Sequence, residues 1–154
     1  MQFTTISSKV LPAGTVVQVV RNYQVQTGGS NHISTTSTSY TASGIQASIT
    51  PTASGNLILV NWVSGMTNAT NEGLAIMYQR IGSGSFAAMN TAGYHMGYRS
   101  STAGHDPMVH SSSYTATSTD TLTYEPYIKT GGTGTFYLIH GASSYALTLT
   151  EVQQ

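Results

Sequence analysis

Turn-forming residues interrupt this chain at short intervals, and this spacing is the strongest constraint on its fold. Clusters of Gly, Asn and Ser separate stretches that are rich in β-branched and aromatic residues, while strong helix formers such as Glu, Lys and Arg are scarce. Parallel strands need crossover connections, usually helices, and none are expected here. The sequence therefore predicts an all-β fold: an antiparallel β-sandwich of jelly-roll or Greek-key type with seven to nine strands.

The alternation of apolar and polar residues locates individual strands. Ile45, Ala47 and Ile49 are predicted to face one way, and the residues between them the other. Residues 56–64 and 74–81 are predicted to be central strands, because parts of them are apolar on both faces. Further strands are expected at residues 15–24, 32–42, 113–129, 135–140 and 145–152, with shorter ones within 83–89 and 94–99.

Charge is almost absent from the chain, which limits the partners that it can bind. Five basic and five acidic residues leave a net charge of zero, while 20 Ser and 24 Thr supply polarity. Binding to nucleic acid or to an acidic membrane needs a cationic surface, so neither is expected. Because a net charge near zero favours association, the chain either depends on its hydroxyls for solubility or assembles.

The length of 154 residues predicts one domain. We expect a β-sandwich over residues 14–154, preceded by an N-terminal arm at residues 1–13, which lacks clear periodicity. The chain has no cysteine, which excludes disulfides and thiolate metal sites. Its first residues do not resemble a signal peptide, and its longest apolar runs are shorter than a membrane helix.

The residues that could support catalysis form no recognisable site. No G-x-S-x-G motif occurs, and the sequence does not bring two carboxylates together. Most acidic residues are expected in turns or on exposed strand faces. The acidic residues are Glu72, Asp106, Asp120, Glu125 and Glu151. We therefore predict that the chain is not an enzyme and uses no cofactor.

One cluster of potential metal ligands consists of His105, Asp106 and His110, with His95 ten residues before the first. Imidazole and carboxylate groups bind metals. However, two histidines five residues apart face opposite sides of a strand, and Pro107 predicts a loop. We predict a polar loop without a bound metal; an ion shared between several subunits is the alternative.

A candidate binding surface consists of Tyr94, His95, Tyr98 and Arg99. Aromatic rings with hydrogen-bonding tips are suited to stacking on sugars and to protein interfaces. If this segment is a strand, the two tyrosines share one face, and the histidine and arginine share the other. The alternative is a half-buried strand whose tyrosines face the core. Trp62, the only tryptophan, lies in a central strand and is expected in the core.

Threonine recurs at every second position from Thr115 to Thr123. This pattern predicts that the threonines line one face of one strand. Rows of threonine can bind ice, but such surfaces need several aligned rows, and this chain has no repeat. A solvated strand face is therefore expected.

Three groups of motifs distinguish this chain from other β-rich sequences. The first is residues 11–20 (LPAGTVVQVV), and the second comprises residues 37–41 (STSYT) and 44–60 (GIQASITPTASGNLILV). The third pairs residues 134–138 (GTFYL) with residues 145–152 (YALTLTEV). These stretches together resemble small β-sandwich structural proteins of tailed bacteriophages. Residues 83–111 have no counterpart in the resemblance.

The resemblance implies a virion protein, assembled in the host cytoplasm, often trimeric and without catalytic residues. The chain has no fibre shaft, so the predicted function is a capsid decoration (cement) protein that clamps neighbouring subunits of the shell. The alternative is a tail-fibre or receptor-binding tip that recognises a cell-surface glycan through residues 83–111. The expected partners are copies of the chain in a homotrimer, and the major capsid protein or other virion proteins.

Overall fold

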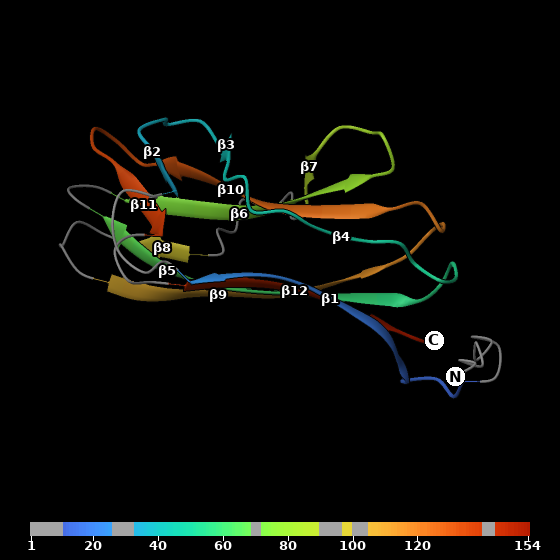
Figure 1. Ribbon diagram of the computed structural model, residues 1–154. Helices are drawn as coiled ribbons and strands as arrows, with labels where there is room; N and C mark the ends of the chain where they lie inside the picture. The colour runs from blue at the N-terminus through green and yellow to red at the C-terminus, as the bar shows by residue number, and fades with distance from the viewer. Residues whose placement is uncertain (1–10, 26–32, 69–71, 90–96, 100–104, 140–143) are drawn as a thin grey trace.

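Two antiparallel β-sheets packed face to face form the fold (Figure 1). The computed structural model describes residues 11–25, 33–68, 72–89, 97–99, 105–139 and 144–154. Within these ranges, residues 66–68, 97–99, 105–106 and 139 are described by their backbone alone. The ten pairings between the described strands are all antiparallel. The predicted fold class, an all-β antiparallel sandwich, is confirmed.

The first sheet, which we call sheet I, is built around its longest strand, β5. One side of β5 pairs first with β12 and then with β11, while its other side pairs with β9 along the whole length of that strand. The edge strand β1 pairs with β12, and β2 pairs with β11. The strands of sheet I are β1 (Val16–Val25), β2 (Ile33–Thr35), β5 (Leu57–Asn68), β9 (His105–Thr115), β11 (Phe136–Ile139) and β12 (Ser144–Val152).

The second sheet, sheet II, is built around the long pair β6 and β10. Four short strands complete it: β3 and β4 pair with β10, and β7 and β8 pair with β6. The strands of sheet II are β3 (Thr41–Ala42), β4 (Ala47–Ile49), β6 (Gly73–Ile81), β7 (Ala87–Ala88), β8 (Gly97–Arg99) and β10 (Leu122–Thr130). The described residues form twelve strands, of which seven have four or more residues.

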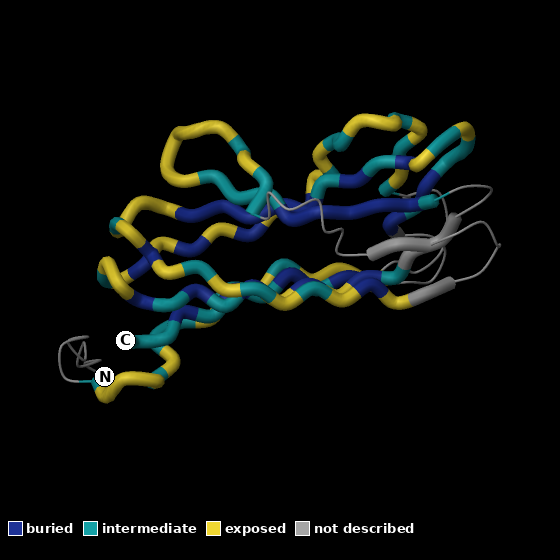
Figure 2. Tube along the Cα trace, turned by 180° about the vertical axis from the view of Figure 1, so that it is seen from behind, coloured by how far each residue is buried: buried dark blue, intermediate teal, exposed yellow. Residues whose placement is uncertain are grey.

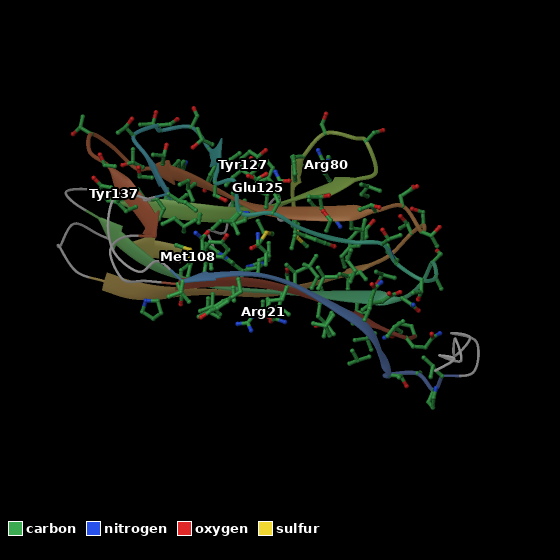
Figure 3. All side chains as sticks on the ribbon, in the orientation of Figure 1. Arg21, Arg80, Met108, Glu125, Tyr127 and Tyr137 are labelled. Atoms are coloured by element: carbon green, nitrogen blue, oxygen red, sulfur yellow. The ribbon has the colours of Figure 1, made fainter. Side chains whose placement is uncertain are left out.

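The core lies between the two sheets and follows the alternation of the sequence (Figure 2). Ile45, Ala47 and Ile49 are buried as predicted, while the residues between them are exposed. Trp62 is also fully buried, as expected. Figure 3 shows Met108 of β9 pointing between the sheets toward sheet II.

The threonine row does not lie on one strand, so that prediction is wrong. The chain leaves β9 at Thr115, turns through residues 116–121 and enters β10 at Leu122. Ser118 stabilises the turn, because its Oγ accepts a bond from the backbone N of Asp120 at 3.2 Å and donates to the carboxylate of the same residue at 2.9 Å. Serine, threonine and aspartate thus form a turn from their own side chains, without glycine or proline.

The start of the described chain lies beside its C-terminus (Figure 1). The backbone N of Gly14 donates to the carbonyl of Gln153 at 2.7 Å, and the backbone N of Gln153 donates to Thr15 at 2.9 Å. Residues 1–10 of the predicted arm are outside the described residues. A search of the described part of the chain finds no helix with the length and apolar character needed to cross a membrane.

Candidate interaction surface

The outward side of four neighbouring strands of sheet I forms a surface that we call the valine face. The strands lie in the order β1, β12, β5 and β9, and their register places outward residues in rows across the sheet. One row, for example, joins Tyr23, Ala146, Val63 and Val109. The face comprises Val16, Val19, Arg21, Tyr23 and Val25 of β1; Ser144, Ala146, Thr148, Thr150 and Val152 of β12; Leu57, Leu59, Asn61, Val63 and Gly65 of β5; and Pro107, Val109, Ser111, Ser113 and Thr115 of β9.

Large apolar side chains are unusually exposed on the valine face. The described residues include seven large apolar side chains that are exposed, and six of them belong to this face. Their exposed fractions run from 47% for Val63 to 61% for Val109. The six are Val16, Val19, Tyr23, Val25, Val63 and Val109. Single exposed apolar residues are ordinary, but their concentration on one face is typical of an interaction site.

The valine face is also almost free of charge. Among the outward residues of the four strands whose side chains are described, Arg21 is the only charged one, and its guanidinium lies 4.6 Å from the centre of the Tyr23 ring. Figure 3 shows Arg21 pointing away from sheet II, on the outside of the sandwich. The remaining polar groups are hydroxyls and one amide, which can form hydrogen bonds without the large desolvation cost of an ion.

The candidate surface predicted from the sequence falls largely outside the described residues. Tyr94 and His95 are not described. Tyr98 and Arg99 belong to β8, where their backbones pair with Leu74 and Gly73 of β6, and only their backbones are described. The structure therefore places two of the four residues on one short strand of sheet II, and their role stays a prediction.

The histidine cluster lies on a strand, so the predicted loop at Pro107 is wrong. β9 runs from His105 to Thr115, and Pro107 pairs with Gly65 of β5. Proline is found on edge strands, and β9 has no hydrogen-bonded neighbour on its other side among the described residues. His110 makes a 2.8 Å hydrogen bond between its Nε2 and the Oγ of Ser112, and burial lowers the pKa of its imidazole.

The histidines and acids show no metal site in the described part of the chain. A group of three or more His, Cys, Asp or Glu side chains that could hold an ion is not found there. His95 is not described, and only the backbones of His105 and Asp106 are, so the cluster as a whole lies outside the described residues.

A row of four aromatic rings lies on the outer side of sheet II. Tyr78 of β6 and Tyr127 of β10 stack with their ring centres 3.9 Å apart. Tyr40 lies against the first at 6.5 Å, and Phe86 against the second at 5.9 Å. Tyr40 and Phe86 belong to the two loops that rise above sheet II in Figure 1, before β3 and before β7. The row therefore packs both loops onto the sheet.

A cation lies at each end of this aromatic row. The ammonium of Lys129 is 4.7 Å from the centre of the Tyr40 ring, and the guanidinium of Arg80 is 4.8 Å from that of Phe86. Such cation–π contacts contribute about 0.5–1 kcal/mol each at partly exposed sites. Burial is the main cause that raises the pKa of Tyr127, followed by the nearby Glu125 carboxylate. Rings that stack on one another have fewer free faces for a ligand, so packing is their first role.

Two carboxylates are buried, although acids were expected in turns or on exposed strand faces. Glu151 of β12 is fully buried, and Glu125 of β10 nearly so. Glu125 accepts hydrogen bonds from the backbone N of Gly44 and from Nε2 of Gln46, both at 2.7 Å. It thereby fixes the segment before β4 against sheet II. The prediction was wrong because strand alternation does not show when a loop covers the outer side of a sheet.

Glu151 joins three segments of the chain. Its Oε1 accepts bonds from the backbone N and Oγ1 of Thr52, at 2.7 and 2.8 Å, and from Nδ2 of Asn56 at 2.7 Å. Its Oε2 accepts a 2.6 Å bond from Nε2 of Gln18 on β1. Burial raises the pKa of this carboxyl, but the hydrogen bonds outweigh burial, and the pKa lies below its ordinary value. With its acceptor sites taken by the protein, Glu151 has a structural role.

The valine face is the surface that sequence reasoning missed. The relevant pattern lies in residues 15–24, where valine recurs, but the pattern alone does not show which side of the strand faces the solvent. Strand β1 alternates between outward valines and inward polar groups such as Gln18 and Asn22, which bond to Thr50 and Gln46 of the segment that covers this edge. Most valines of β1 therefore point outward, while Gln18 and Asn22 point inward beside Val20, so this strand does not follow the pattern of an ordinary solvated strand.

No protein-family model matches this sequence, and neither does any curated protein. Among solved structures, the whole chain is similar to 42% of a chain in the structure of infectious bursal disease virus Gx strain, with a TM-score of 0.50 and 9% identity. The VP2 subviral particle of the same virus gives a TM-score of 0.48 at 10% identity, covering 90% of this chain and 38% of that one. A structure of CBM4 gives 0.27 at 12% identity, covering 87% and 91%.

Of these three similarities, the first shows a shared fold. The present chain spans less than half the length of the viral chain that it matches. The chain, with its two antiparallel sheets, therefore has a β-sandwich fold similar to part of a chain in the infectious bursal disease virus structure.

Proposed function

We propose that this chain is a non-enzymatic structural protein of a bacteriophage virion, acting as a capsid decoration protein. In this function the valine face is buried in contacts with other virion subunits, and these contacts stabilise the shell. The observation that carries the proposal is the face itself: a sheet surface with six exposed large apolar side chains and one charge. A subunit that packs many times on a symmetric shell benefits from such a surface, because it creates little electrostatic repulsion.

Three further observations support a structural role. The fold is similar to that of a viral structural protein, and the sequence motifs resemble those of phage virion proteins. The buried carboxylates that could have served as catalytic acids, Glu125 and Glu151, are occupied by hydrogen bonds within the protein. The residues of the fold therefore support contact surfaces better than chemistry.

The copy number and position of the protein on purified virions test this proposal. A decoration protein is expected in hundreds of copies distributed over the shell, measured by quantitative mass spectrometry and by immunogold labelling. A handful of copies confined to the tail would refute decoration.

The second candidate is a receptor-binding tip that recognises a glycan. The aromatic row on sheet II favours it, because Tyr40, Tyr127 and their neighbours are partly exposed and are flanked by Lys129 and Arg80. Loops carried on a rigid sandwich are common recognition sites. Binding on a glycan array that is lost in Tyr98→Ala or Tyr127→Ala would support the tip, and no binding by the wild-type chain would count against it.

A further inference from the structure

We propose that the valine face is covered by other copies of this same chain, so that the protein self-associates before it meets any other virion subunit. This inference rests on the proposed function, because it names the partner of the surface that carries it. Three properties of the face point to a copy of the chain: its area, its charge and the position of its polar groups.

The area of the valine face is sufficient for a stable contact between two copies. Four strands spaced about 4.8 Å apart, with nine residues at about 3.4 Å each, give a surface of about 20 Å by about 30 Å, or about 600 Å². Two such surfaces together bury about 1,200 Å², which exceeds the roughly 1,000 Å² expected of a specific interface. Sheets readily pack in this way, with their apolar faces about 10 Å apart.

The charge of the face favours a copy over a charged partner. Contact between identical surfaces brings together two faces with the same net charge, so a face with charges of one sign repels its copy. The valine face has one charge, Arg21, which lies on the edge strand β1 over the ring of Tyr23. An edge position keeps this guanidinium at the rim of a contact, where charges remain solvated. No acidic side chain lies among the described outward residues of the four strands, so the face offers no carboxylate partner for a basic protein.

The polar groups of the face can pair with their own kind. Thr148, Thr150, Ser111 and Ser113 carry hydroxyls, and each hydroxyl is both a donor and an acceptor. Two identical hydroxyl rows can therefore satisfy one another across a symmetric contact, which two rows of carboxylates or ammonium groups cannot do. The apolar side chains around these hydroxyls, such as Val19 and Val109, would exclude water from them.

The molar mass of the purified chain tests the inference, measured by light scattering during size-exclusion chromatography at micromolar concentration. We expect a defined oligomer, with a mass of two or more times 16.2 kDa. Val63→Lys on β5 and Val109→Lys on β9 should each raise the dissociation constant at least about 30-fold, because they place like charges in the contact.

The matched control is Ile81→Lys, because Ile81 is the exposed large apolar side chain among the described residues that lies on sheet II instead. This variant should associate as the wild-type chain does. Retained emission from the buried Trp62 confirms that each variant is folded. A wild-type monomer, or lysine variants on the valine face that associate normally, would overturn the inference.

This experiment uses the chain alone, so it separates the inference from the proposed function. A monomer that still decorates virions in many copies would show that the shell covers the valine face and would overturn self-association only. An oligomer that is absent from purified virions would overturn decoration and leave self-association supported.

Discussion

Glu151→Gln should destabilise the fold while changing almost no atom positions. The carboxylate accepts four hydrogen bonds from Gln18, Thr52 and Asn56. Glutamine can keep its oxygen toward Thr52 and Asn56, but its amide nitrogen then faces the amide nitrogen of Gln18. Flipping Gln18 is not free, because its Nε2 also donates to the carbonyl of Thr50 at 2.7 Å. One charge-assisted bond is therefore lost and a donor is left unpaired.

The cost of this substitution follows from the hydrogen bonds that it removes. A hydrogen bond to a charged group contributes about 1.5–3 kcal/mol, and an unpaired buried donor costs about 1–3 kcal/mol. Burying a neutral amide is cheaper than burying a carboxylate, which offsets part of the loss. We expect the free energy of unfolding to fall by about 2–4 kcal/mol at pH 7. Urea denaturation followed by the emission of Trp62, the only tryptophan and fully buried, measures this value.

The pKa of Glu151 predicts how the effect of the substitution on the free energy of unfolding changes with pH. The pKa of Glu151 is lower in the folded chain than its ordinary value, because the hydrogen bonds outweigh burial. Its stabilisation is therefore fully present above the unfolded pKa, about 4.3, and is lost as the pH falls through the folded pKa. The difference between wild type and Glu151→Gln should be constant near neutrality and shrink in acid. Asp120→Asn, on an exposed turn, is the control and should change stability by less than about 1 kcal/mol.

Two results would refute this reasoning. One is a Glu151→Gln variant as stable as the wild type at pH 7. The other is a difference in unfolding free energy that stays constant as the pH falls well below the unfolded pKa of the carboxyl group.

Three further predictions concern packing, loops and charge. Gly73→Ala should lower the free energy of unfolding by about 1–3 kcal/mol or more, because a Cβ there would overlap Cδ2 of the buried Phe136 ring. The melting temperature should fall accordingly. An unchanged melting temperature would show that the ring can move aside. Tyr127→Ala should speed hydrogen exchange in residues 36–40 and 82–86, because the aromatic row packs both loops onto sheet II. Unchanged exchange would show that other contacts hold the two loops in place. Self-association should change less than about threefold between about 0.05 M and about 0.5 M NaCl, measured by light scattering, because the contact contains few ions; a steep dependence would contradict an uncharged interface.

The fold could be predicted from the sequence wherever the alternation of apolar and polar residues along a strand matches the burial of its side chains. Ile45, Ala47 and Ile49 alternate with polar residues and are buried as expected, and Trp62 lies in the core. The same rule predicts seven to nine strands, and seven of the described strands have four or more residues. Strands such as β3 and β7 have two residues each, too few to produce a pattern.

The valine face could not be predicted, because alternation identifies the two sides of a strand but does not show which side faces the core. The outward valines of β1 and the inward Gln18 reverse the usual pattern, since Gln18 bonds to the buried Glu151. The turn at residues 116–121 could not be predicted from residue types, because threonine favours strands and also stabilises turns. The valine face depends on long-range packing, and the turn depends on local bonds between Ser118 and Asp120, and strand propensity reveals neither.

Thiol labelling tests most directly whether the valine face is a contact surface. The chain has no cysteine, so Val63→Cys and Ile81→Cys each introduce one unique label on an exposed side chain. In the assembled protein, labelling at position 63 should be at least about tenfold slower than in the diluted monomer, because local opening must precede reaction. Labelling at position 81 should be equally fast in both states. Equal rates at position 63 in the assembled and diluted protein would contradict the account.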